Sequence, residues 1–200
     1  MAIRVANNQS LSAITALPSA VSGGAMTLLE TQTASSSATI SFTSNIDSTY
    51  DEYVFKFYNI HPATDDQPLT FQANAAGGSG YNETMTTTYF RAYHTEADGT
   101  PAVGYDGNRD LAQSTSFQQV ISDIGNGNDE CGSGYLHLFN PSSTTFVKHF
   151  ICTTSSLSSG GEVVQYIAGY FNTTSAIDEI QFKMASGNID AGVIKLYGIS

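Results

Sequence analysis

The sequence predicts an all-β fold, an antiparallel two-sheet sandwich of the jelly-roll kind with about ten strands, preceded by an extended N-terminal arm. From Leu28 onwards, short apolar–polar alternations are separated by turn residues at intervals of roughly 8 to 12 residues, which is the spacing of a sandwich or barrel. Ser, Thr, Asn and Gly are abundant beside 11 Phe and 11 Tyr, and Trp is absent. This composition favours short strands and tight turns over helices.

The length of 200 residues suits one all-β domain. A domain of this size buries roughly 70% of its unfolded surface, so it needs no metal or disulfide to fold. We expect a docking arm over residues 1–25 and the sandwich over residues 26–200.

The arm is uncharged over most of its length. Residues 5–29 hold no Asp, Glu, Lys or Arg, and Pro18 and Gly23–Gly24 interrupt their apolar spacing. The stretch is too short to fold alone, and we expect it to become ordered on another copy or on a larger assembly. A disordered tail is the alternative, although such tails usually carry more charge. The residues expected to make the assembly contacts are Ile3, Val5, Leu11, Ile14 and Leu17.

Five strands are expected before residue 95. The stretch Tyr53–Ile60 is apolar on both faces apart from Lys56 and Asn59, so we place it at the centre of a sheet. Turn residues separate it from its neighbours, with Ala34–Ala38 between the first two strands. The five expected strands cover residues 28–33, 39–43, 53–60, 69–74 and 85–94.

The second half of the chain begins irregularly. Residues 95–132 hold many turn residues, and only 117–124 has a strand-like apolar centre. At the end of the chain, Ile177–Met184 and Val193–Ser200 flank a Gly-containing turn and predict a β-hairpin that closes a sheet. The remaining strands are expected over residues 117–124, 135–139, 146–154 and 163–171.

Charge excludes several partners. Only 12% of the residues are charged, yet the formal net charge is −11. Seven scattered Lys and Arg cannot build the basic stripe that nucleic acid or an anionic membrane requires. The sequence has no apolar run of about 18 residues and no secretory signal, so membrane insertion is not expected either. Cys131 and Cys152 are expected to be free thiols in a protein made in the cytoplasm.

No motif predicts catalysis or a cofactor. The glycine clusters lack the nucleophile elbow of serine hydrolases and the Gly-Lys-Ser/Thr of a phosphate loop. Asp65–Asp66 and Asp129–Glu130 fall in loops, where carboxylates are usually just solvated. His137, His149 and Cys152 are close in sequence, but His149 and Cys152 should point to opposite faces of one strand, which favours structural histidines over a zinc site.

Asp106–Asp110 imitates the opening of a calcium loop. Leu111 stands where the turn glycine belongs, and no Glu closes the loop. Two interpretations follow, ordinary solvated loop acids and a weak calcium site; the first is favoured.

Aromatic residues gather around the irregular middle of the chain. Part of this group should fill the core. Exposed aromatic rings on loops of a sandwich suit sugar stacking or a protein interface. The candidate contacts for a glycan or a protein partner are Tyr81, Tyr93 and Tyr105.

Several segments resemble a module of structural proteins from tailed bacteriophages, especially marine and cyanobacterial ones. The segments are Leu28–Ala34, Ile46–Tyr50, Asn59–Asp65, Leu138–Thr145, Gly169–Ala176 and Lys183–Ile199. The resemblance spans residues 24–200 and implies a virion structural protein, made in the cytoplasm of the bacterial host, whose β-module lies at the particle surface. It does not cover the residues before 24, and it implies no catalytic residues.

Three functions remain open at this stage. The favoured one is a virion structural protein, either a capsid decoration protein or a component of a head or tail fibre, docked by its arm and assembled with other copies, preferably as a trimer. The alternative is a tail-fibre module that recognises host surface glycan through Tyr81, Tyr93 and Tyr105. The third, an enzyme that degrades host polysaccharide, is not favoured.

Overall fold

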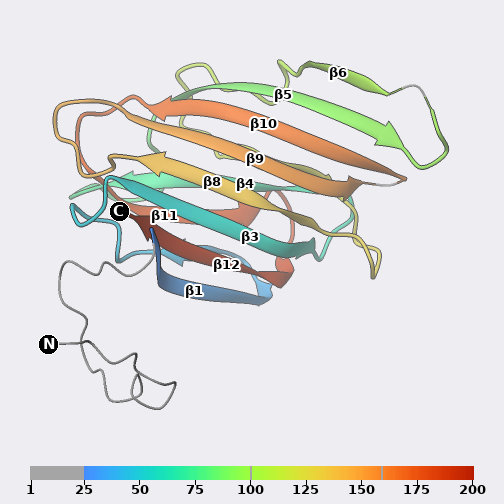
Figure 1. Cartoon of the computed structure of the whole chain (residues 1–200), viewed down its shortest axis with the longest axis horizontal. Helices are drawn as coiled ribbons and strands as arrows, with labels where there is room; N and C mark the ends of the chain where they lie inside the picture. Colours follow the sequence, from blue (N-terminus) through green and yellow to red (C-terminus); the bar gives the residue numbers. More distant parts are fainter. Residues whose placement is uncertain (1–24, 100, 159) are drawn as a thin grey trace, which may run out of the picture.

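The computed structural model describes residues 25–200 with the exception of residues 100 and 159. Residues 1–24 of the predicted arm, with Ile3, Val5, Leu11, Ile14 and Leu17, lie outside the described residues. Within them the chain forms twelve strands and no helix, arranged as two antiparallel sheets packed face to face (Figure 1). The predicted all-β sandwich is therefore confirmed. No helix of the described part has the length and apolar character of a membrane span.

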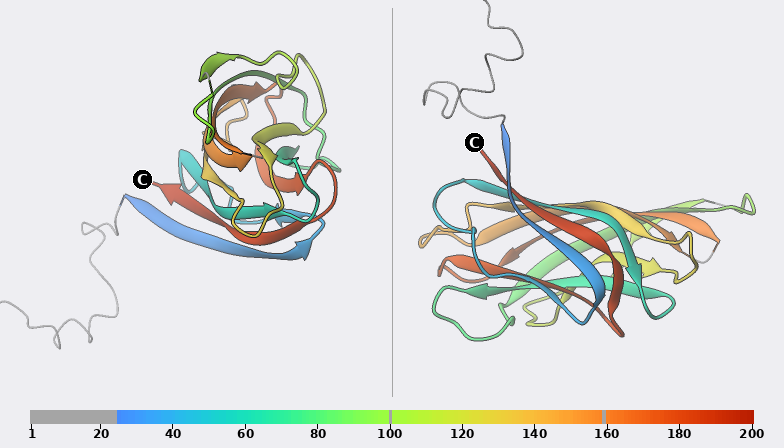
Figure 2. Two further views of the ribbon diagram at one scale, coloured as in Figure 1. Left: turned by 90° about the vertical axis from the view of Figure 1, so that its right-hand side faces the viewer. Right: turned by 90° about the horizontal axis from the view of Figure 1, so that it is seen from below.

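The larger sheet has eight strands and the smaller sheet has four. In spatial order, the large sheet consists of β1 (Met26–Ser37), β12 (Ile189–Ile199), β3 (Glu52–Pro62), β8 (Gly132–Phe139), β9 (Lys148–Ser158), β10 (Gly161–Phe171), β5 (Met85–Thr95) and β6 (Ala102–Tyr105). The small sheet consists of β2 (Ile40–Phe42), β11 (Ile177–Met184), β4 (Gln67–Ala75) and β7 (Gln118–Ile124). The two layers are seen edge-on in Figure 2.

Eight of the strands pair in a nested order. β1 pairs with β12, β2 with β11, β3 with β8 and β4 with β7. Each pair is enclosed in the sequence by the one before it, and successive pairs alternate between the large sheet and the small sheet. This is the jelly-roll arrangement. The other four strands, β9, β10, β5 and β6, extend the large sheet beyond β8.

The predicted closing hairpin is wrong. β11 and β12 belong to different sheets, and the residues between them cross from one layer to the other. Backbone hydrogen bonds fix this crossing, because Ala185 N donates to Pro68 O and Asn188 O accepts from Ala63 N, each at 3.0 Å. The expected strands at 28–33 and 39–43 are divided between the sheets in the same way, as β1 and β2. Two stretches of apolar–polar alternation joined by a turn are compatible with a hairpin and also with an arch, in which the chain crosses from one sheet to the other.

The structure has twelve strands against about ten expected, and the eleven expected stretches account for all of them but one. The missed strand is β6, which lies in the stretch where only residues 117–124 were expected to form a strand. β6 has four residues, all of them exposed, and it pairs only with β5. It carries no buried face, so no hydrophobic alternation marks it in the sequence.

The core between the sheets is aromatic. Phe182 of β11 packs edge-on against Phe42, Phe55 and Phe57, with ring centroids 5.3 to 6.2 Å apart. Phe71 packs against Phe150 at 5.0 Å. Burial of each such side chain contributes about 1.5–3 kcal/mol. The predicted central position of Tyr53–Ile60 is confirmed, since β3 lies between β12 and β8.

The sandwich has two distinct ends. Ala25 and Ser200 lie together at one of them, where Ser200 N donates to Ala25 O at 3.3 Å, beside the loops 43–51 and 140–147. We call this the arm end, because residues 1–24 precede it in the chain. The opposite end, which we call the far end, holds the turns after β5 and β7 (Figure 1).

Candidate binding site at the far end

Four strands cover only part of a sheet of eight. β7, the last strand of the small sheet, packs under β9 and β10. The segment 106–117 lies along the edge of β5, where Thr87 N donates to Leu111 O at 2.9 Å, and Leu111 packs against the core. Towards the far end this cover stops. The inward-pointing residues of β5 therefore become more exposed along the strand, from Tyr89 at 0% through the partly exposed Arg91 to Tyr93 at 41%.

Two arginines and two aspartates form a compact cluster below the end of β5. Arg91 contacts Asp106 at 3.2 Å and Asp123 at 3.1 Å. Arg109 donates to Asp106 at 3.0 Å and to both carboxylate oxygens of Asp123 at 2.7 and 2.9 Å. Its third nitrogen donates to Gln119 Oε1 at 2.6 Å. Planar, charge-assisted bonds of this kind hold both guanidinium groups in fixed positions.

A β-bulge brings Asp123 to the arginines. The pairing of β4 with β7 shifts register between Gln67 and Leu69, and Asp123 lies opposite this irregularity with a φ of 51°. Aspartate tolerates this left-handed conformation better than most residues. Bulges commonly redirect a side chain next to a functional site, and here the bulge places a carboxylate between two cations.

Burial and charge shift the proton equilibria around this cluster. Burial alone would lower the pKa of Arg109, but the charge and hydrogen bonds of Asp123 outweigh it and raise the pKa above its ordinary value. Burial raises the pKa of Tyr89, which lies just inside the cluster, to about 12. Arg109 and Tyr89 therefore keep their protons across the physiological range.

The two aspartates of the calcium-like motif, Asp106 and Asp110, contact different residues. The carboxylate of Asp106 is only 14% exposed and contacts both arginines, so the expectation of an ordinary solvated acid is wrong for this residue. The carboxylate of Asp110 instead accepts a hydrogen bond from the hydroxyl group of Tyr105, and this bond raises the pKa of Tyr105. In the described part of the chain, no three His, Cys, Asp or Glu side chains are grouped so that they could hold a metal ion.

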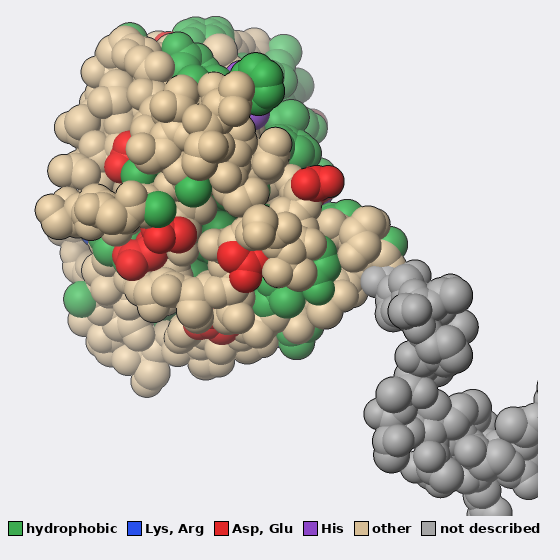
Figure 3. Space-filling view, turned by 90° about the vertical axis from the view of Figure 1, so that its left-hand side faces the viewer, with side chains coloured by type: hydrophobic (Ala, Val, Ile, Leu, Met, Phe, Trp, Pro, Cys, Tyr) green, Lys and Arg blue, Asp and Glu red, His purple; other side chains and the backbone are tan. Residues whose placement is uncertain are grey.

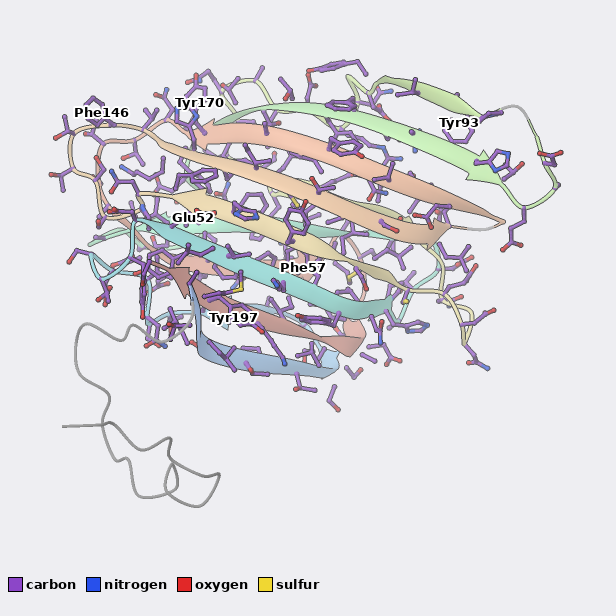
Figure 4. All side chains as sticks on the ribbon, in the orientation of Figure 1. Glu52, Phe57, Tyr93, Phe146, Tyr170 and Tyr197 are labelled. Atoms are coloured by element: carbon purple, nitrogen blue, oxygen red, sulfur yellow. The ribbon has the colours of Figure 1, made fainter. Side chains whose placement is uncertain are left out.

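Three hollows surround Tyr93, whose position at the far end of β5 is labelled in Figure 4. Two of them, of about 250 and 330 Å³, lie on the inward side of the sheet, and both are lined by Arg91 and Tyr93. The third, of about 450 Å³, has its apolar lining on the outward side, from Ala92, Val103 and Val164. We call the two inward hollows, with Arg91, Tyr93 and Asp123, the far-end site.

The structure separates the three predicted contact residues. Tyr93 and Tyr105 both border the hollow of about 330 Å³, but Tyr93 points inward whereas Tyr105 pairs with Phe90 on the outward side. Tyr81 lies elsewhere, before β5, and donates to Glu179 Oε2 of β11 at 2.9 Å, so it belongs to the small sheet's surroundings. Arg91 and Asp123 were not singled out from the sequence, and Asp106 and Arg109 were considered only as part of the calcium-like motif.

The histidines and cysteines do not converge. His137 contacts Glu52 and stands opposite Ile151, while His149 is exposed on the outward side of β9. Cys152 is buried on the inward side of β9, as its odd separation from His149 predicted, and burial raises the pKa of its thiol. Cys131 and Cys152 are both free thiols, as expected.

The outward side of the large sheet forms a second notable surface. Of the eleven large hydrophobic residues that are exposed in the described part of the chain, nine lie there. Phe90 and Tyr166 stack at 5.0 Å, and Tyr105 is the cross-strand partner of Phe90. Figure 3, seen from the arm end, shows hydrophobic side chains gathered along one flank of the molecule. The nine residues of this outer aromatic face are Met26, Leu28, Tyr58, Phe90, Val103, Tyr105, Tyr135, Ile151 and Tyr166.

Few charged side chains lie on the outer aromatic face, and those described next contact neighbouring side chains. Lys56 lies 5.4 Å from the ring centre of Tyr197, and Lys195 lies 5.5 Å from that of Tyr58. Glu162, at the far-end margin, accepts from Ser155. The small sheet differs, because its outward side is partly covered: Gln72 Nε2 donates to the backbone of Glu83 and Thr115 at 3.0 and 3.1 Å. The large sheet thus presents the more open of the two outward surfaces.

Comparison with known proteins gives no relative for this chain. No protein-family model, no curated protein and no solved structure matches it. The far-end site combines the exposed ring of Tyr93 with the fixed hydrogen-bonding groups of Arg91 and Asp123, beside hollows that can hold a small ligand. These are the features of a ligand-binding site.

Proposed function

We propose that this chain is a structural protein of a tailed bacteriophage particle, docked by its N-terminal arm and displaying the sandwich at the particle surface. The observation that carries the proposal is that the two ends of the molecule differ. The segment 1–24, in which Arg4 is the only charged side chain, leads into β1 at the arm end, and the far-end site lies at the opposite end of the same sheet. A sandwich held at the arm end presents its hollows away from the particle.

Fold and sequence support the same role. Jelly rolls are frequent in viral capsid and lectin domains, although a fold alone does not assign a function. The segments that resemble phage structural proteins lie mainly in strands of the large sheet, from β1 to β12, and in the loops that follow them. Capsid decoration and a head or tail fibre component are the two placements that this role includes. The protein is made in the cytoplasm of the bacterial host and functions on the virion.

Other copies of the chain are the proposed partners, together with other virion proteins. The outer aromatic face supports self-association, since large exposed apolar patches commonly mark protein interfaces. Eight strands spaced about 4.8 Å apart make this face about 34 Å wide. A stable interface needs about 800 Å² per partner, which a face of this width can supply. We propose a trimer, in which this face is covered by neighbouring copies.

The role that we propose is not catalytic and involves neither nucleic acid nor membrane. Asp106 and Asp123 are both tied to arginines, whereas a general acid must carry a proton near neutral pH. Incubation with host surface polysaccharide is therefore expected to release no reducing ends. Release that disappears in Asp123→Asn would contradict this part of the proposal.

The location on the particle tests the proposal. Purified particles of the phage that encodes this chain are analysed by mass spectrometry and labelled with gold-coupled antibody against residues 26–200. We expect the chain among the particle proteins and the label on the outside of the capsid or tail. Its absence from purified particles would contradict the proposal, and the position of the label distinguishes decoration from fibre.

A further inference from the structure

The ring of Tyr93 is kept accessible by the small residues around it. Its partner on β6 is Ala102, and the partner of Arg91 on that strand is Gly104, where no atom lies within 4 Å of the position of a Cβ. On β10 its partner Val163 is nearly buried. A hollow therefore opens on either side of a ring that is 41% exposed, and both hollows contain Arg91.

The four charged groups of the cluster beside the ring are fixed and neutralise one another, while Glu162, which also borders the hollow of about 250 Å³, belongs to the outward face of β10. Arg91 and Arg109 carry two positive charges, and Asp106 and Asp123 carry two negative charges. The cluster therefore has no excess charge to attract an anion or a cation. Arg91 uses Nε and Nη1 for its aspartates, and its Nη2 makes no hydrogen bond to the described part of the chain. A neutral ligand rich in hydroxyl groups can take up donors and acceptors held in this way.

We infer that the far-end site binds a neutral saccharide, with a sugar ring stacked on Tyr93 and its hydroxyl groups bonded to Arg91 and Asp123. The apolar C–H face of a sugar matches the aromatic ring, and the hydroxyl groups match the planar side chains next to it. Hollows of about 250 and 330 Å³ suit one or two sugar units each. That the sugar belongs to the host surface rests on the proposed function, whereas the site itself does not.

An extended peptide is the rival occupant. β6 is an edge strand, and edge strands accept additional strands through their unpaired backbone groups. β6 offers only four residues for such pairing, however, and the ring and the cluster lie on the inward side rather than along its edge. A saccharide contacts both the ring and the cluster, whereas a peptide paired with the edge of β6 would contact neither.

The test is binding of the full chain to a panel of neutral sugars, measured by saturation-transfer NMR and calorimetry. The panel holds glucose, galactose, mannose and N-acetylglucosamine, each also as linear trisaccharides. We expect at least one to bind, and Tyr93→Ala to weaken that binding at least about tenfold because the stacking surface is lost. Tyr135→Ala is the matched control, since Tyr135 is equally exposed at 41% on the outer aromatic face, and it should leave the affinity unchanged.

A second variant guards against indirect effects. Ala102→Tyr fills the inward hollow beside Tyr93 from an exposed edge position, so it should abolish binding with an unchanged melting temperature. The inference is overturned if no sugar of the panel binds at millimolar concentration, or if binding survives both Tyr93→Ala and Ala102→Tyr. The location of the chain on particles is measured independently of these variants, so failure here leaves the proposed function standing.

Discussion

At the scale of single residues, Lys148 shows how one buried cation holds the arm end together. Its side chain is 1% exposed, and Nζ donates to the backbone carbonyls of Ser143, Phe146 and Thr173 at 2.9 to 3.1 Å. Burial lowers the pKa of Lys148. The three carbonyls come from two different loops, so this one ammonium group joins the loop before β9 to the turn after β10.

Replacing this ammonium group should destabilise the fold. Lys148→Met keeps much of the apolar stem but leaves three carbonyls without their donor, and we expect a loss of about 2–4 kcal/mol in the free energy of unfolding. Urea titration followed by circular dichroism measures it. Lys195→Met, on the surface beside Tyr58, is the control and should change stability by less than about 0.5 kcal/mol. Equal effects of the two substitutions would contradict the structural role of Lys148.

The site residues show which contacts a sequence can predict. Tyr93 was identified because it is an aromatic residue near an irregular stretch. The arginine–aspartate cluster was not, because Arg91, Asp106, Arg109 and Asp123 come from three separate elements and meet only in the folded chain. One signal was present: Arg91 stands on the same side of its strand as Met85 and Tyr89, and a charge there needs a partner.

At the scale of elements, strands were predictable and their pairing was not. Alternation between apolar and polar residues depends only on having one buried face, and it located all the strands except β6. Whether two neighbouring strands pair or separate depends on where the turn sends the chain. Between β11 and β12, Gly187 has a φ of 74°, and a Cβ there would lie 2.4 Å from Thr64 Oγ1.

Adding a single methyl group at Gly187, in the crossing between β11 and β12, should therefore lower the stability of the fold. Gly187→Ala forces a side chain into a left-handed conformation and into contact with Thr64, and we expect a loss of about 1–3 kcal/mol in the free energy of unfolding. Gly104→Ala is the control, because it has open space around its Cβ position. Thermal and urea unfolding compare the two, and a tolerated Gly187→Ala would mean that the crossing is formed differently.

At the scale of the whole molecule, the two sides of the large sheet have separate roles in this account. The outward side carries the outer aromatic face, and the inward side, at the far end only, carries the site around Tyr93. One surface is thus free for neighbouring copies while the other stays open to solvent. The arrangement allows assembly and ligand binding to occur together.

Self-association through the outer aromatic face can be tested by removing two of its rings. We expect the full chain to sediment as a trimer at micromolar concentration, and the double variant Phe90→Ser and Tyr166→Ser to sediment as a monomer with an unchanged fold. Both rings are more than 40% exposed, so the fold does not depend on them. Phe146→Ser, which alters an exposed loop at the arm end, is the control. A trimer that survives the double substitution would assign the interface to another surface.

Docking through the N-terminal arm is the central claim, and incorporation into particles tests it most directly. The full chain and a shortened chain that begins at Met26 are each supplied during infection by a phage that lacks its own copy, and their occupancy on purified particles is measured by quantitative mass spectrometry. The shortened chain retains all twelve strands, which circular dichroism can verify. We expect it to be folded and absent from the particles, while the full chain occupies them. Normal occupancy by the shortened chain would contradict the account.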